Sequence, residues 1–209
     1  MLKLKLFSPG MIYCNCYIVK DDESGEAFIV DPGAYNKRLE SMLRQEGIEK
    51  LRYILLTHGH FDHIMGARDL RADFGGEIAI HEADAGCLSD GRKSLASKFF
   101  FPQKDITADI ILSDGAELSL GEHKIKVLHT PGHTKGSVCY ILSDMIFSGD
   151  TLFKNSVGRT DFPGGSFEEI EISMKKLYDL EGDFKVYPGH EADTTLERER
   201  CFNPYMKGI

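Results

Sequence analysis

Short segments of alternating or wholly apolar residues predict several strands and one helix in the first part of the chain. Leu2–Phe7 alternates apolar and charged residues, which is typical of an edge strand. Residues 14–19 and Ala27–Val30 are two apolar runs joined by a polar turn, as expected of paired strands. Over residues 36–46 apolar side chains recur with helical spacing, and Gly47 follows as a C-cap.

A second round of strand and helix follows. Residues 53–56 form a short apolar run that predicts a buried strand. A helix is predicted over residues 64–74, ended by two glycines, and a further strand over Glu77–His81. The pattern over residues 83–110 is weak, and its cluster Phe99-Phe100-Phe101-Pro102 has two interpretations. The cluster forms either a local core or the wall of a pocket.

The second half of the chain repeats this order of elements. Two hairpins are predicted from segments 117–120 with 124–128 and 137–142 with 145–147. An amphipathic helix, a short strand and a short helix are predicted next, over residues 167–180, 185–187 and 196–201. Two halves of this kind predict an α/β fold in which two sheets pack face to face with helices outside.

Length and composition restrict the classes of function. A chain of 209 residues predicts a single domain over residues 1–209. The formal net charge of −8 disfavours nucleic acid as a partner, because nucleic-acid binding requires a basic surface. No apolar run has the length of a membrane span, so we expect no membrane partner. Five cysteines without a Cys-x-x-Cys pair, and a first segment unlike an export signal, favour the cytoplasm.

The segment Thr57-His58-Gly59-His60-Phe61-Asp62-His63 directly follows the predicted strand 53–56. Neutral imidazole nitrogens and carboxylate oxygens are common ligands of metal ions in proteins. In an extended segment, residues two apart point the same way, so His58 and His60 can share one metal. Asp62 and His63 are one step further on and can reach a second metal.

Three more candidate ligands each follow a predicted strand and a glycine, namely His133, Asp150 and His190. Loops at one end of a rigid sheet are where binding groups usually converge. The seven candidates exceed the four ligands of one tetrahedral zinc, so they predict two metal ions with a shared ligand. Asp150 is the predicted shared ligand, because a carboxylate can offer one oxygen to each ion.

These motifs resemble the metallo-β-lactamase superfamily. The resemblance rests on His58-x-His60-x-Asp62-His63, on the later ligands, and on the flanking segments Asp31-Pro32-Gly33, Thr130-Pro131-Gly132-His133, Ser148-Gly149-Asp150-Thr151 and Tyr187-Pro188-Gly189-His190. It implies an αββα sandwich of two mixed β-sheets with helices on the outer faces. It also implies that His58, His60 and His133 hold a first metal, that Asp62, His63 and His190 hold a second, and that Asp150 bridges the two.

Within this superfamily the chain looks most similar to the glyoxalase II-like, or hydroxyacylglutathione hydrolase-like, branch. Aspartate stands at position 150, where β-lactamases of this type usually carry cysteine. Histidine stands at position 60, where flavodiiron proteins carry an acidic residue. Only 19 residues follow His190, so we expect a short form without the C-terminal helical domain that binds glutathione in the long form.

The function expected from this resemblance is hydrolysis of a small-molecule thioester by a bridging hydroxide held between two divalent ions, most readily zinc, with iron or manganese as alternatives. Asp62 and Asp150 are the expected catalytic residues. A persulfide dioxygenase-like oxidoreductase with one iron on His58, His133 and Asp150 is the main alternative. A metal-dependent nuclease is disfavoured by the negative charge.

The sequence allows more than one role for Arg159 and for the histidines at positions 81 and 129. Arg159, in the turn-rich segment 159–165, is either a solvated turn residue or a group that positions the substrate or supports the metal loop. His81 and His129 lie near predicted strand ends, where hydrogen-bonded positions around the ligands or within the core are expected.

Overall fold

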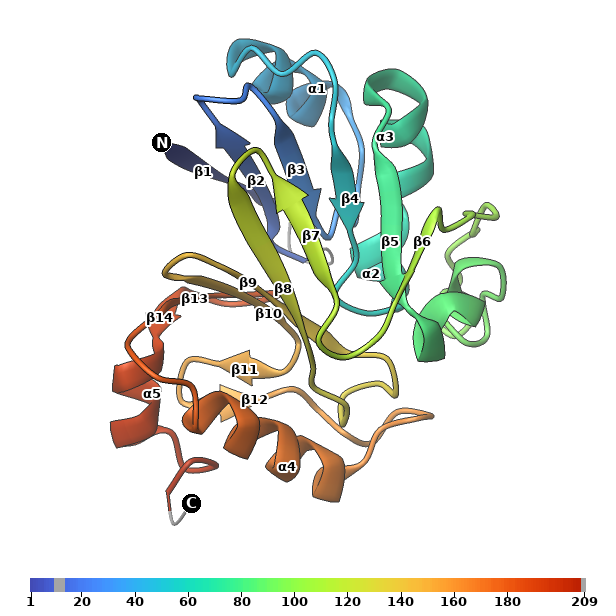
Figure 1. Ribbon diagram of the computed structural model, residues 1–209. Coiled ribbons are helices and arrows are strands. Elements are labelled where there is room, and N and C mark those ends of the chain that lie inside the picture. The colour runs from blue at the N-terminus through green and yellow to red at the C-terminus, as the bar shows by residue number, and fades with distance from the viewer. Residues whose placement is uncertain (10–13, 208–209) are drawn as a thin grey trace.

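A computed structural model describes residues 1–9 and 14–207 and contains two six-stranded sheets packed face to face (Figure 1). The first sheet has the order β1-β2-β3-β4-β5-β6, with bounds Leu2–Phe7, Cys16–Asp21, Ala27–Val30, Tyr53–Leu55, Glu77–His81 and Ile110–Leu112. The second has the order β14-β13-β10-β9-β8-β7, with bounds Thr194–Thr195, Lys185–Pro188, Met145–Gly149, Val138–Leu142, His123–His129 and Glu117–Leu120. Both sheets combine parallel and antiparallel pairs and are therefore mixed.

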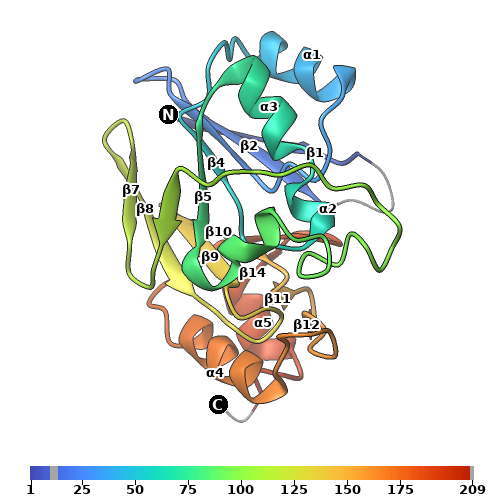
Figure 2. The ribbon, with the colours of Figure 1, turned by 90° about the vertical axis from the view of Figure 1, so that its right-hand side faces the viewer.

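Helices lie on the outer face of each sheet (Figures 1 and 2). On the first sheet these are α1 and α3, and on the second α4 and α5, with bounds Lys37–Gln45, Ala67–Phe74, Phe167–Tyr178 and Leu196–Phe202. Three shorter elements complete the described chain, namely helix α2 (Phe61–Ile64), the 3-10 helix η1 (Glu82–Leu88) and the ribbon of β11 (Leu152–Phe153) with β12 (Ser156–Val157). None of the described helices is long and apolar enough to cross a membrane.

Three apolar layers hold these elements together. One lies between α1, α3 and the first sheet, one between the two sheets, and one between the second sheet and α4 and α5. Strand β3 shows how the sequence builds two of them, since Ala27 and Ile29 enter the first layer while Phe28 and Val30 enter the second. Alternate residues of a strand point to opposite faces, so a strand covered on both faces is apolar throughout. The layer order confirms the predicted αββα sandwich.

Helix α4 follows directly from its sequence. The Ser166 side chain accepts the backbone N–H of Glu169, which caps the first turn. Ile170, Met174 and Leu177 then recur with helical spacing and are buried, and the last two pack against the second sheet. The predicted helix 167–180 is correct apart from its last two residues.

The predicted helix 64–74 is wrong in its first part, because the chain forms two helices separated at Met65 and Gly66. The N–H of Gly66 donates to the carbonyl oxygen of Pro32 at 2.7 Å. A Cβ atom on Gly66 would lie 2.4 Å from that oxygen, so only glycine permits this approach. The break gives Asp62 and His63 their own short helix, α2, instead of the extended segment that the sequence predicted.

Candidate metal centre

The seven predicted ligands lie together at one end of the two sheets, although they come from four separate segments of the chain. His58 and His60 follow β4, and Asp62 and His63 stand on α2. The other three follow the carboxyl ends of β8, β10 and β13 and are His133, Asp150 and His190. The predicted convergence of strand-end loops therefore gathers ligands from both sheets.

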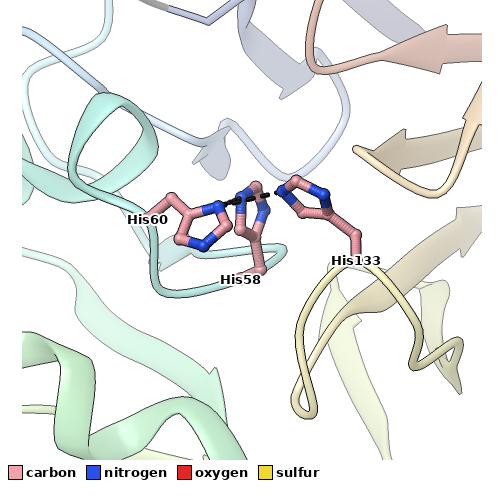
Figure 3. Close-up of side chains that lie close together, drawn as sticks. All are labelled: His58, His60 and His133. Atoms are coloured by element: carbon pink, nitrogen blue, oxygen red, sulfur yellow. Dashed lines mark hydrogen bonds between the residues drawn. The ribbon is translucent and has the colours of Figure 1, made fainter. Parts of the chain in front are cut away.

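A first group consists of His58, His60 and His133, whose ring nitrogens face one another (Figure 3). His58 Nε2 lies 3.1 Å from His60 Nδ1, which lies 2.9 Å from His133 Nε2. All three residues are buried. Three nitrogens that meet at one point, with their rings spread around it, form the arrangement of ligands around a metal ion.

A second group consists of Asp62, His63 and His190. The two histidines face each other through their Nε2 atoms, which are 3.3 Å apart. Asp62 Oδ2 lies 3.3 Å from His190 Nε2 and 3.7 Å from His63 Nε2. This group offers two nitrogens and one carboxylate oxygen, a donor set that suits zinc, iron or manganese.

Asp150 stands between the two groups. Its Oδ1 lies 3.5 Å from His63 Nε2, and its Oδ2 lies 3.5 Å from His133 Nε2. Oδ1 is buried and accepts no hydrogen bond from the described residues. Gly189 leaves room for it, because a Cβ atom there would lie 2.3 Å from Oδ1. A buried carboxylate oxygen without a donor is costly, and a cation would satisfy it, so the residues present fit a pair of metal ions.

Hydrogen bonds on the outer side of three rings fix which nitrogen faces inward. His133 Nδ1 donates to the carbonyl oxygen of Arg159 at 2.8 Å, and His63 Nδ1 donates to Asp31 Oδ2 at 2.9 Å. The Thr57 hydroxyl donates to the same Asp31 oxygen, so it accepts from His58 Nδ1 at 3.2 Å. Each ring therefore directs its Nε2 to the centre, in the orientation that metal-binding histidines adopt.

Burial keeps His58 and His60 neutral. It lowers the pKa of His58 well below the ordinary histidine value and lowers the pKa of His60 to about 3, since charged imidazole loses its hydration there. The neighbouring histidine rings add to both shifts through repulsion of like charges. Neutral imidazole is the form that binds metals.

Comparison with known proteins identifies the family. A family model described as the metallo-beta-lactamase superfamily matches residues 9–190. The chain belongs to the metallo-beta-lactamase superfamily. Members of this superfamily are generally hydrolytic enzymes that bind metal ions. The resemblance stated from the motifs is thereby confirmed.

Three similar members of the superfamily bear on fold and function. The chain is 34% identical over 197 residues to hydroxyacylglutathione hydrolase GloC of Haemophilus influenzae, with 92% of each chain covered. It is 32% identical over 214 residues to the mitochondrial persulfide dioxygenase ETHE1 of Homo sapiens, covering 99% of this chain and 76% of that protein. The crystal structure of the BLEG-1 B3 metallo-beta-lactamase superposes with a TM-score of 0.92 at 34% identity, covering 99% of this chain and all of the other.

Asp31 is a buried residue of this metallo-beta-lactamase fold whose part in the centre the sequence interpretation did not assign. Its Oδ1 accepts the backbone N–H of Thr57 at 2.7 Å, and its Oδ2 accepts the Thr57 hydroxyl at 2.6 Å as well as His63 Nδ1. One carboxylate thus holds the start of the histidine segment and one ring of the second group. The sequence feature that could have identified Asp31 is its position directly after a predicted strand.

Asp84 is a second such residue and joins the two loops of the first group. Its Oδ2 accepts the N–H of Gly59 at 2.8 Å and the hydroxyl of Thr134 at 2.7 Å, and its Oδ1 accepts the N–H of Gly136 at 2.8 Å. Gly59 lies between His58 and His60, and the other two donors follow His133. A Cβ atom on Gly136 would lie 2.6 Å from the Asp84 carboxyl carbon, so this contact requires glycine.

Replacement of Asp84 by alanine is expected to weaken metal binding at the first group by about 10- to 100-fold, because its loops lose the partner that fixes them. Competition for zinc with a chromophoric chelator measures the two binding constants. The second group should keep its affinity, since Asp84 bonds the loops of the first. Asp90→Ala is the matched control, because that carboxylate accepts the N–H of Arg92 within the same segment. Two unchanged tight sites in Asp84→Ala would contradict this role.

A pocket of about 640 Å³ opens onto the centre. Phe61, Phe99, Phe101 and Phe162 form one side of it, beside His60. Phe101 also stacks on Phe61, with ring centroids 4.9 Å apart. Within the cluster over residues 99–102, Phe99 and Phe101 therefore contribute to a pocket wall and Phe101 also to a local core, the two interpretations that its sequence left open.

Arg159 supports this region in two ways. Its carbonyl oxygen holds the His133 ring, as described above, and its guanidinium makes two hydrogen bonds of 2.7 Å with the carboxylate of Asp161. The guanidinium carbon also lies 3.9 Å from the centroid of the Phe162 ring. Arg159 thus supports a metal loop through its backbone and the pocket wall through its side chain.

Proposed function

We propose that the chain is a binuclear metallohydrolase that cleaves a small-molecule thioester. The observation that carries this proposal is the pair of ligand groups with the Asp150 carboxylate between them. One group supplies three imidazole nitrogens, and the other supplies two imidazole nitrogens and a carboxylate. Each group can therefore hold one divalent ion, with zinc favoured and iron or manganese possible. When bound, such a pair supplies a water of lowered pKa and positive charge for a developing oxyanion.

The chain's own residues would orient the reactants. His58, His60 and His133 would hold the first ion, Asp62, His63 and His190 the second, and Asp150 both. The side chain of Asp62 is 17% exposed and so is reached from the pocket, where it can orient the attacking water and accept its proton. The water oxygen joins the acyl carbon, the carbon–sulfur bond breaks, and the sulfur leaves with a proton as the free thiol. The products are a carboxylic acid and a thiol.

Similarity to the hydroxyacylglutathione hydrolase GloC supports thioester hydrolysis. Similarity to the persulfide dioxygenase ETHE1 supports a second candidate, an oxygen-activating site with one iron. A specific contact favours that candidate as well, because Asp150 Oδ2 faces His133 Nε2 at 3.5 Å beside His58, so two histidines and a carboxylate can share one ion. The second group favours hydrolysis, since a site with one metal leaves Asp62, His63 and His190 without a ligand role.

Release of free thiol from an acyl thioester tests the proposal. We expect turnover by the metal-loaded protein, loss of turnover after chelation, and recovery when divalent metal is added back. The chelated protein serves as the blank, because exposed Cys201 reacts with thiol reagents. Oxygen uptake with a persulfide, measured in parallel, separates the alternatives. Oxygen consumption without thiol release from any thioester would favour the dioxygenase and overturn the hydrolase.

A further inference from the structure

A continuous aromatic wall leads from the surface to the first ligand group. Phe61 packs against Phe101 and Phe99 with ring centroids 4.9 and 5.5 Å away. Phe99 lies 6.3 Å from Phe162, which meets the ring of His60 edge-on at 6.0 Å. These rings come from α2, from the segment after η1 and from the loop after β12. A substrate at the centre therefore lies beside aromatic rings contributed by three parts of the chain.

Further contacts fix the aromatic wall in place. The N–H of Phe61 donates to the carbonyl oxygen of Ser94 at 2.9 Å, which ties the segment to the helix that carries two candidate ligands. Leu95, which follows, is buried and has a φ of 67°, a strained value for a branched residue. Lys98 Nζ lies 4.4 Å from the Phe162 ring centroid and holds the opposite part of the wall.

The chemistry of the wall suits an apolar group. Phe99 is 44% exposed, although large apolar side chains are usually buried, and it lines the pocket. The thiol halves of cellular thioesters are polar carriers such as CoA, so the apolar surface matches the acyl half. We infer that the pocket selects substrates whose acyl group is aromatic or bulky and apolar, an inference that rests on the proposed thioester hydrolysis. Small polar acyl groups would leave the wall without a partner.

Thioesters of one thiol, N-acetylcysteamine, test this selectivity. The metal-loaded protein should hydrolyse the phenylacetyl thioester with kcat/KM about tenfold or more above that of the acetyl thioester. Phe99→Ala should reduce that ratio to within about twofold, because truncation removes the aromatic contact at the rim. Phe100→Ala is the matched control from the same segment, since Phe100 is 93% exposed and is not part of the pocket lining formed by described residues. It should keep the wild-type ratio.

Equilibrium binding separates failure of this inference from failure of the proposed reaction. Non-hydrolysable thioether analogues with a phenyl or a methyl group are titrated into metal-loaded protein by calorimetry. The phenyl analogue should bind about tenfold more tightly, and Phe99→Ala should remove the difference. Hydrolysis of both thioesters with equal kcat/KM, together with equal analogue binding, would overturn the inference while thioester hydrolysis stands. Phenyl-selective binding without hydrolysis of any thioester would support the pocket's ligand class and overturn the proposed reaction.

Discussion

Asp150→Ala is expected to lower thioester turnover by at least about 1,000-fold, because the change removes the carboxylate that lies between the two ligand groups, and metal centres contribute several kcal/mol to such reactions. The fold should survive. In the metal-free protein Asp150 Oδ1 is buried without a donor among the described residues, so its removal relieves an unfavourable group. The metal-free variant should therefore unfold at a temperature no lower than the metal-free wild type. The functional centre would then be a local cost to stability, as active sites often are.

Asp144→Ala is the matched control for this prediction. Asp144 lies just before β10, whereas Asp150 follows the other end of that strand, and its side chain is 62% exposed beside Lys185. The control should keep both turnover and the rise in melting temperature that added zinc produces. Near-normal thioester hydrolysis by metal-free Asp150→Ala would rule out the proposed role of Asp150.

Asp31→Ala, unlike Asp150→Ala, is expected to destabilise the metal-free protein. It leaves the Thr57 N–H, the Thr57 hydroxyl and His63 Nδ1 without their buried acceptor. We expect the free energy of unfolding of the metal-free protein to fall by about 3 kcal/mol or more, since each unsatisfied buried donor costs about 1–3 kcal/mol. Metal affinity should fall at both groups, because Thr57 precedes His58 and His63 belongs to the second group. Urea unfolding and elemental analysis measure the two effects.

Asp31→Asn provides the control for Asp31→Ala. The amide keeps one acceptor oxygen and the size of the side chain, so we expect it to restore part of the lost stability. A metal-free Asp31→Ala protein destabilised by less than about 1 kcal/mol, with both metals still bound, would show that this carboxylate does not hold the centre. The contrast between Asp31 and Asp150 separates a carboxylate that positions ligands from a carboxylate that would itself bind the metals.

Much of the fold could be predicted because local patterns and packing agree. In β3 the apolar run is buried on both faces, and in α4 the helical spacing, the serine cap and the buried face coincide. The break at Gly66 was not predictable, because it depends on an approach to Pro32, which is distant in sequence. The strands β11, β12 and β14 have two residues each, too few to show a period.

The seven candidate ligands could be predicted because each follows a strand end and carries a metal-binding group. The residues that hold them were harder to assign. Asp31 and Asp84 also follow strands, yet their partners are backbone N–H groups and hydroxyls whose positions only the fold supplies. Arg159 acts partly through a backbone carbonyl, which no residue type reveals. The ligand roles and the cytoplasmic location remain predictions.

The most direct test of the binuclear proposal is the metal content of wild-type protein purified without added metal. Two bound ions and their shared carboxylate predict about two divalent metals per chain, with zinc expected first. Asp150→Ala protein purified in the same way should contain neither ion and should not hydrolyse the thioester. A content of one iron per chain, unchanged after addition of excess zinc or iron, would contradict the binuclear centre.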